Sequence, residues 1–304
     1  MRSLVIFAVV AACGLAQAQS NPKFEYAKAE EAKKQAELDK VEWKAGAAAG
    51  MVITTGNSET ETITGAATAS RRDKDNKVQI EANGAYARST VFLPNDLNGN
   101  NVIDDNTEIN EETQTTTQQW LFRGRYDRFL TLRNSVFVSA AIGANQPAGK
   151  DLIGNGQLGF SRIIVKDKIH EVVAEGGYDY TYENLTTAEK NDINIHSVRA
   201  FMGYKGKASA DTEIAGGVEL LVNLNEVDLP TQKAEFAEDT RVNGNATLTT
   251  KLFKDISFRF GFTVLYDNAP APRPGLSIPF AMGFVPEANK VDTKTEASLI
   301  INFL

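Results

Sequence analysis

The side chains best suited to chemistry in this chain are two histidines, one serine beside a histidine, and one cysteine. His170 and His196 are far apart, and Cys13 is the single cysteine, so no metal-ligand pair stands at zinc spacing. His196 is followed by Ser197, a pair of residue types found in lipases. On a strand, however, neighbouring residues point to opposite faces, so His196 could not activate Ser197. We therefore expect no catalytic residues, with a lipase or a protease as the alternative.

An acidic loop predicted over residues 90–112 is the second candidate site. It holds six acids and no Lys or Arg: Asp96, Asp104, Asp105, Glu108, Glu111 and Glu112. Part of it resembles the calcium loops of EF-hand and dockerin type, with oxygen ligands expected at Asp96, Asn98, Asn100 and Asp104. In the twelve-residue calcium loop, position 6 is usually Gly, and here it is Asn101. Position 12 usually carries a carboxylate, whereas here it is Thr107, and Glu108 follows one residue later. We expect weak Ca²⁺ binding or an ion-free surface turn, and no other cofactor.

The elements that position these groups are strands. Ile256, Phe258, Phe260, Phe262, Val264 and Tyr266 alternate with Ser257, Arg259, Gly261 and Thr263. A period of two is typical of a strand with one apolar face, which could face either a soluble core or lipid.

Twelve strands are predicted, at 43–55, 60–72, 77–90, 113–129, 134–144, 151–166, 169–183, 192–204, 211–223, 239–252, 256–267 and 290–304. After the first hairpin, short turns alternate with mostly longer loops. An even number of strands with loops sorted in this way is typical of an outer-membrane β-barrel, and a soluble β-sandwich has no reason to sort its loops. The fold class expected is all-β: a 12-stranded antiparallel outer-membrane barrel with a short N-terminal helical segment.

In a barrel, one face of each strand points to the lumen. Nine charged residues are predicted there as possible selectivity groups: Glu81, Arg123, Arg125, Glu171, Glu175, Glu219, Arg259, Lys294 and Glu296. Twelve strands lie between the filled barrels of eight and the open channels of sixteen or more. The charges could pair across a closed lumen or line a narrow channel. Six tyrosines are expected at the membrane interfaces: Tyr86, Tyr126, Tyr178, Tyr180, Tyr182 and Tyr266.

The first 42 residues are predicted to be a signal peptide and a lead-in. Arg2, an apolar run over residues 4–12 and the sequence Ala16-Gln17-Ala18 predict a signal peptide over residues 1–18. A lipoprotein site with an acylated Cys13 is the alternative. Residues 19–42 are predicted to be a periplasmic helix, and residues 43–304 the barrel.

Composition excludes two classes of protein. No run of 18 apolar residues occurs, which argues against membrane-spanning helices. The formal net charge of −7 argues against a nucleic-acid surface. The expected partners are outer-membrane lipids and the barrel-assembly machinery, because the chain ends in an alternating strand with Phe303 next to the last residue. The oligomeric state is left open.

Three segments resemble one known family. They are Gly56-Asn57-Ser58, the segment Arg125-Tyr126-Asp127-Arg128-Phe129-Leu130-Thr131, and residues 154–165. Together they resemble the uncharacterised bacterial outer-membrane barrel family named salt-induced outer-membrane protein, over roughly residues 43–304. The resemblance implies a barrel in the outer membrane and no settled activity. The function expected is a structural barrel or a narrow channel for small solutes or ions, with an outer-membrane enzyme or an exported β-sandwich binding module as alternatives.

Overall fold

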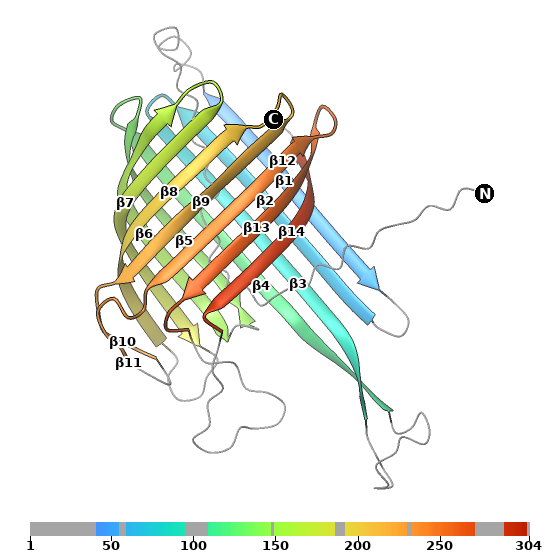
Figure 1. Ribbon diagram of the computed structural model, residues 1–304. Helices are drawn as coiled ribbons and strands as arrows, with labels where there is room; N and C mark the ends of the chain where they lie inside the picture. The colour runs from blue at the N-terminus through green and yellow to red at the C-terminus, as the bar shows by residue number, and fades with distance from the viewer. Residues whose placement is uncertain are drawn as a thin grey trace, which may run out of the picture.

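The computed structural model describes residues 41–54, 59–94, 109–146, 149–185, 192–229, 233–270 and 289–302. Its strands form one closed antiparallel barrel of twelve, with the first and last strands paired (Figure 1). The barrel strands are β1 (Glu42–Thr54), β2 (Glu59–Asp73), β3 (Asn76–Pro94), β4 (Ile109–Phe129), β5 (Asn134–Asn145), β6 (Lys150–Lys166), β7 (His170–Leu185), β8 (Asp192–Lys207), β9 (Thr212–Asn223), β12 (Arg241–Lys251), β13 (Ile256–Asp267) and β14 (Val291–Asn302).

The predicted fold class is therefore confirmed, and all twelve predicted strands are present. Two details were wrong. The loop predicted over residues 90–112 is shorter, because β3 and β4 stay paired as far as Pro94 and Ile109. This hairpin projects beyond the barrel (Figure 1). A small hairpin, β10 (Val227–Asp228) and β11 (Lys233–Ala234), also forms in the connection after β9. The predicted N-terminal helix lies outside the described residues.

Short turns gather at one end of the barrel, together with the start of β1 and the end of β14 (Figure 1). The strand ends that border the longer connections lie at the other end. Since short turns are periplasmic and long loops extracellular in barrels of this kind, these two ends define the orientation used below. No helix among the described residues is long and apolar enough to cross a bilayer.

The outer surface of the barrel is an apolar belt. On β13, Phe258, Phe260 and Phe262 point outward and are exposed, whereas Gly261 and Leu265 on the opposite face are buried. The strand has 12 residues, which at about 3.3 Å per residue and a tilt of about 45° match an apolar band roughly 25 Å tall. This exposed face is explained by contact with lipid acyl chains, and a soluble sandwich would bury it.

Aromatic side chains mark both edges of the belt. All six predicted girdle tyrosines share the outward alternation of their strands. Near the periplasmic end, the Tyr126 hydroxyl donates to Asn76 at 2.6 Å. Near the extracellular end, the Tyr266 hydroxyl donates to Asn268 at 2.9 Å. Each ring thus contacts the apolar belt while its hydroxyl group reaches polar residues at the ends of the strands.

Candidate functional site

One side of the lumen is lined by a buried ion-pair network. Arg125 on β4 contacts Glu175 on β7 with 2.8 Å between Nη2 and Oε1. Glu175 also accepts from Arg199 on β8 at 2.8 Å, and Arg199 Nε donates to Glu219 on β9 at 2.5 Å. Arg125 donates in addition to Asp127, at 2.6 Å. These side chains are between 1% and 5% exposed, and alternating charges offset the cost of removing each one from water.

Two aromatic rings support the arginines of this network. The guanidinium carbon of Arg125 lies 4.0 Å from the ring centroid of Phe137 on β5. Arg199 lies 5.3 Å from the ring of Phe201. A guanidinium over an aromatic face is attracted to the ring, and its in-plane N–H groups can still donate hydrogen bonds. The network is therefore fixed in position as well as neutralised, and it fills this part of the lumen.

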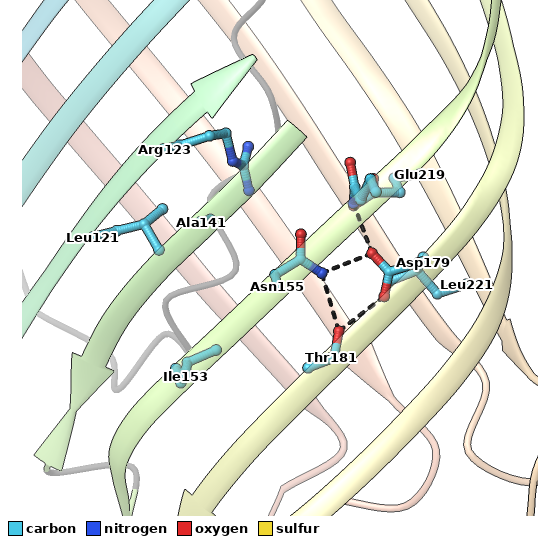
Figure 2. Close-up of a pocket in the computed structure, with 10 residues that line it drawn as sticks. Leu121, Arg123, Ala141, Ile153, Asn155, Asp179, Thr181, Glu219 and Leu221 are labelled. Atoms are coloured by element: carbon cyan, nitrogen blue, oxygen red, sulfur yellow. Dashed lines mark hydrogen bonds between the residues drawn. The ribbon is translucent and has the colours of Figure 1, made fainter. Parts of the chain in front are cut away.

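A polar cluster lies beside the network toward the extracellular end (Figure 2). Asp179 on β7 accepts hydrogen bonds from Asn155 at 2.7 Å, Gln157 at 2.8 Å and Thr181 at 2.8 Å. Arg123 enters the same space from β4, and its buried Nη1 has no hydrogen-bond partner. The cavity between them measures about 20 Å³. That volume holds a single water.

A second ion-pair cluster lies at the extracellular end of the same side. Lys150 on β6 contacts Glu183 on β7 at 2.7 Å, and Arg241 on β12 lies 3.6 Å from Glu183. Arg241 also contacts Asp239, which precedes β12, at 3.0 Å. Burial raises the pKa of Asp239 to about 7; Arg241 opposes this increase, while Asp267 and Glu183 add to it. Asp239 lies outside the membrane-spanning strands.

The connection between β9 and β12 covers this part of the barrel mouth. Val227, Leu229 and Ala234 from the β10–β11 hairpin pack in one apolar cluster with inward-facing residues of β7 and β8: Leu185, Ile193 and Ile195. Asn223 holds the connection by donating to the carbonyls of Asn225 at 2.8 Å and Glu235 at 2.7 Å. Its side-chain oxygen accepts from the Asp239 amide at 2.9 Å. We call residues 224–240 the cap.

The opposite side of the lumen is lined by small side chains. On β2, Thr64, Ala66, Thr68 and Ser70 share the inward alternation, and Ala66 and Thr68 are exposed. Gly46, Ala48 and Gly50 of β1 face the same space through the β1–β2 pairing. We call these inward residues of β1 and β2 the small-residue wall, and the inward residues of β4 to β9 the ion-pair wall. The exposure of Ala66 and Thr68 shows that side chains from the ion-pair wall do not reach this surface.

The predicted lumen charges are thus divided among several places. Arg125, Glu175 and Glu219 belong to the network, and Arg123 lines the small cavity. Glu171 pairs with Lys166 at the periplasmic end, at 2.9 Å. Glu81, Arg259 and Glu296 face the lumen and are half-buried. Lys294 pairs with Thr263 in the sheet, and its side chain lies outside the described part of the structure.

Several central residues were missed from the sequence. Arg199 is the most important, since it joins Glu175 to Glu219. It stands between Val198 and Ala200, which face outward, and shares the inward face of β8 with Ser197 and Phe201. The alternation of β8 alone could therefore have placed it in the lumen. Lys150 and Asp239 lie at strand ends, where the alternation gives no such signal.

The other predicted sites have simpler outcomes. His196 and Ser197 do point to opposite faces: Ser197 is buried in the lumen, and His196 lies outside between Tyr178 and Tyr180. No group of three or more His, Cys, Asp and Glu side chains suited to a metal occurs among the described residues. The proposed calcium ligands, Asp96, Asn98, Asn100 and Asp104, lie outside the described residues.

A protein-family model matches residues 47–303, which is nearly the whole barrel. Its description is "Protein of unknown function, DUF481". The chain belongs to this family. The matched range begins within β1 and ends at the last strand, so the family is defined by the barrel itself. No curated protein matches the chain.

Several solved structures align with most of the chain. The NanC porin aligns at 8% identity and a TM-score of 0.46, covering 86% of this chain and 100% of the porin. An outer-membrane channel from Pseudomonas putida F1 aligns at 9% identity and a TM-score of 0.43, covering 86% and 94%. The translocator domain of the autotransporter NalP from Neisseria meningitidis aligns at 11% identity and 0.39, covering 90% and 92%.

The location follows from the barrel's own surface. Its strands close on themselves, its apolar side chains face outward, and its tyrosines mark two edges of that belt. Closed barrels and helices are the structures that satisfy all backbone groups in lipid. The protein is an outer-membrane β-barrel, either structural or a channel.

Proposed function

We propose that the protein is a narrow, off-centre channel for small ions and solutes, with its water-filled path along the small-residue wall. The observation that carries this proposal is the exposure of Ala66 and Thr68, although both point inward from β2. Across the barrel, Asp179, Glu175 and Arg199 are at most 5% exposed. A lumen filled by paired charges throughout would have buried both sides.

The charges near the path are mixed. Glu81 stands opposite Arg123 in the β3–β4 ladder, and Arg259 stands opposite Ser298 in the β13–β14 ladder. Arg259 donates to Thr249 at 3.4 Å, at the edge of hydrogen-bond distance. Because both signs face the lumen, we expect weak discrimination between cations and anions.

A matched pair of tryptophan substitutions tests the path. Thr68→Trp places a bulky ring into the proposed path, whereas Ala67→Trp places the same ring on the lipid-facing side of the same strand. In planar bilayers, we expect Thr68→Trp to reduce single-channel conductance by more than half and Ala67→Trp to leave it near the wild-type value. Equal conductance in both variants, or no conductance in the wild-type protein, would favour a structural barrel.

We propose further that the protein is not an enzyme and that its partners are outer-membrane lipids and the barrel-assembly machinery. The separation of His196 from Ser197 supports the first proposal, and the apolar belt supports contact with lipids. Weak Ca²⁺ binding by the loop after β3, and membership of the salt-induced group within the family, are also proposals. Calorimetry of Asp96→Ala and Asp104→Ala tests the first, and expression at high salt tests the second.

A further inference from the structure

Three arginines point outward at the periplasmic end of the barrel wall, on alternate strands. Arg71 lies two residues before the end of β2, Arg128 one residue before the end of β4, and Arg162 four residues before the end of β6. All three are exposed, and they share the alternation of outward residues such as Tyr126 and Phe160. We call Arg71, Arg128 and Arg162 the basic face.

The basic face stands at the periplasmic edge of the apolar belt. Arg71 pairs with Val78 in the β2–β3 ladder, and Arg128 pairs with Val136 in the β4–β5 ladder. Both valines are exposed on the outer surface and belong to the belt. An arginine stem can lie along such an apolar surface while its guanidinium reaches the polar region beyond it. The basic face therefore lies at the level of the headgroups of the periplasmic leaflet.

Two of the three arginines have an acidic neighbour. Arg71 donates from Nη2 to Asp73 at 2.8 Å, and Nη2 of Arg128 lies 3.9 Å from Asp75, beyond hydrogen-bond distance. Both pairs are exposed, and exposed ion pairs are weak and screened by salt. Arg162 forms no ion pair with any residue that the structure describes. Because each guanidinium has five N–H donors, all three arginines can still donate to another anion.

Other sectors of the outer surface differ from the basic face. At the periplasmic ends of β9, β12 and β13, the outward residues are Thr212, Thr250 and Ile256, which carry no charge. Near the extracellular end, the outward Arg88 of β3 is matched by Glu61 of β2, at 2.8 Å. The excess of positive charge on the lipid-facing surface is therefore confined to the sector from β2 to β6, at one level of the membrane.

From this arrangement we infer that the basic face binds the phosphate groups of anionic phospholipids in the periplasmic leaflet. A guanidinium donates to phosphate oxygens in a bidentate geometry, and basic side chains at a membrane surface attract anionic lipids. A headgroup with a net negative charge is favoured over a zwitterionic one, because the arginines outnumber Asp73 and Asp75. The inference rests on the proposed contact with outer-membrane lipids, and it holds whether or not ions pass through the lumen.

Trp43 reports on this face without an added label, because the guanidinium carbon of Arg71 lies 5.7 Å from its ring centroid. The chain has two tryptophans, so Trp120→Phe leaves Trp43 as the single reporter. The protein is placed in vesicles of equal parts phosphatidylglycerol and phosphatidylcholine, with bromine near the headgroup end of the acyl chains of one lipid or the other. We expect brominated phosphatidylglycerol to quench Trp43 at least about two-fold more than brominated phosphatidylcholine.

Three variants show whether the preference comes from Arg71. Arg71→Gln should bring the quenching ratio close to one, and Asp73→Asn should increase it, because the guanidinium is then released to phosphate. In Trp43→Phe, the remaining Trp120, which is outward and near the extracellular end, should be quenched alike by both lipids. Equal quenching of Trp43 by both lipids, or a ratio unchanged in Arg71→Gln, overturns the inference. A protein that enters neither kind of vesicle contradicts the proposed lipid contact itself, and this inference with it.

Matched triple variants test the whole basic face. One replaces its three arginines with glutamine. The other keeps them and loses three inward cations at the same end of the barrel: Lys205→Gln, Lys207→Gln and Lys251→Gln. Electron paramagnetic resonance of spin-labelled lipids gives the motionally restricted fraction of phosphatidylglycerol and of phosphatidylcholine. We expect the arginine variant to lose at least about half of the excess of restricted phosphatidylglycerol and the lysine variant to keep it. Equal losses would assign the preference to net charge and overturn the basic face as the binding surface.

Discussion

The two sides of the lumen are filled in opposite ways. On the ion-pair wall, Arg125, Glu175 and Arg199 neutralise one another and exclude water. On the small-residue wall, Ala66 and Thr68 leave the space in front of them to solvent. A barrel of twelve strands lies between the filled barrels of eight and the open channels of sixteen or more. The difference shows that filling can be concentrated on one side, which stiffens the barrel and still leaves a path.

The largest expected effect comes from breaking the ion-pair wall. Glu175→Ala leaves Arg125 and Arg199 without the carboxylate they share, and removing one partner of a buried ion pair costs about 3–5 kcal/mol. Samples are heated to a series of temperatures before electrophoresis. We expect the compact, folded band of the variant to disappear at a clearly lower heating temperature than that of the wild type. Glu213→Ala is the matched control, because its pair with Lys205 is exposed and worth under about 1 kcal/mol. Equal shifts in both variants would contradict a structural role for the network.

A smaller effect is expected at the cap. Asn223→Ala removes three hydrogen bonds that hold residues 224–240, while the strand beneath is unchanged. At about 1 kcal/mol per bond, we expect protease cleavage within the cap to become at least ten-fold faster, without loss of the barrel. Asn245→Ala, on the lumen side of β12, should leave cleavage as in the wild type. If Asn223→Ala and Asn245→Ala are cleaved alike, Asn223 does not hold the cap.

The cap should also respond to pH through Asp239. Its pKa is raised to about 7, mainly by burial, so the folded cap binds a proton more strongly than the unfolded cap does. Stability of the cap is therefore full below about pH 4 and decreases as pH rises toward 7. We expect faster proteolysis of the cap at pH 8 than at pH 5. Asp239→Asn should remove most of that difference, and an unchanged pH profile in this variant would assign it to other groups.

The smallest effect is expected from single charges near the small-residue wall. Glu81→Gln should shift permeability toward anions and Arg259→Gln toward cations, because each removes one sign from a mixed, solvated lining. Solvent and salt screen such charges, so each change should stay below about two-fold at 0.15 M salt. Reversal potentials in a salt gradient measure it. Shifts of the same sign in the two variants would place one of these residues away from the path.

Much of the fold could be predicted from the sequence, because a period of two and the sorting of loops by length are local signals. The alternation of Phe258, Phe260 and Phe262 correctly placed the outer face of β13. The same pattern could not show which charges meet. Glu175 lies 50 residues from Arg125 along the chain, and only barrel closure and strand stagger bring them together. For the same reason, the alternation of residues along the strands could not predict that the lumen is filled on one side and open on the other.

The central claim is that water reaches the small-residue wall and not the ion-pair wall. The most direct measurement compares Thr68→Cys with Ser139→Cys, which is inward on β5 and 4% exposed. A charged methanethiosulfonate reagent is added while single channels are recorded. We predict that Thr68→Cys reacts rapidly and loses current stepwise, while Ser139→Cys stays unmodified over the same time. Rapid modification of Ser139→Cys, or no reaction at Thr68→Cys, would contradict the account.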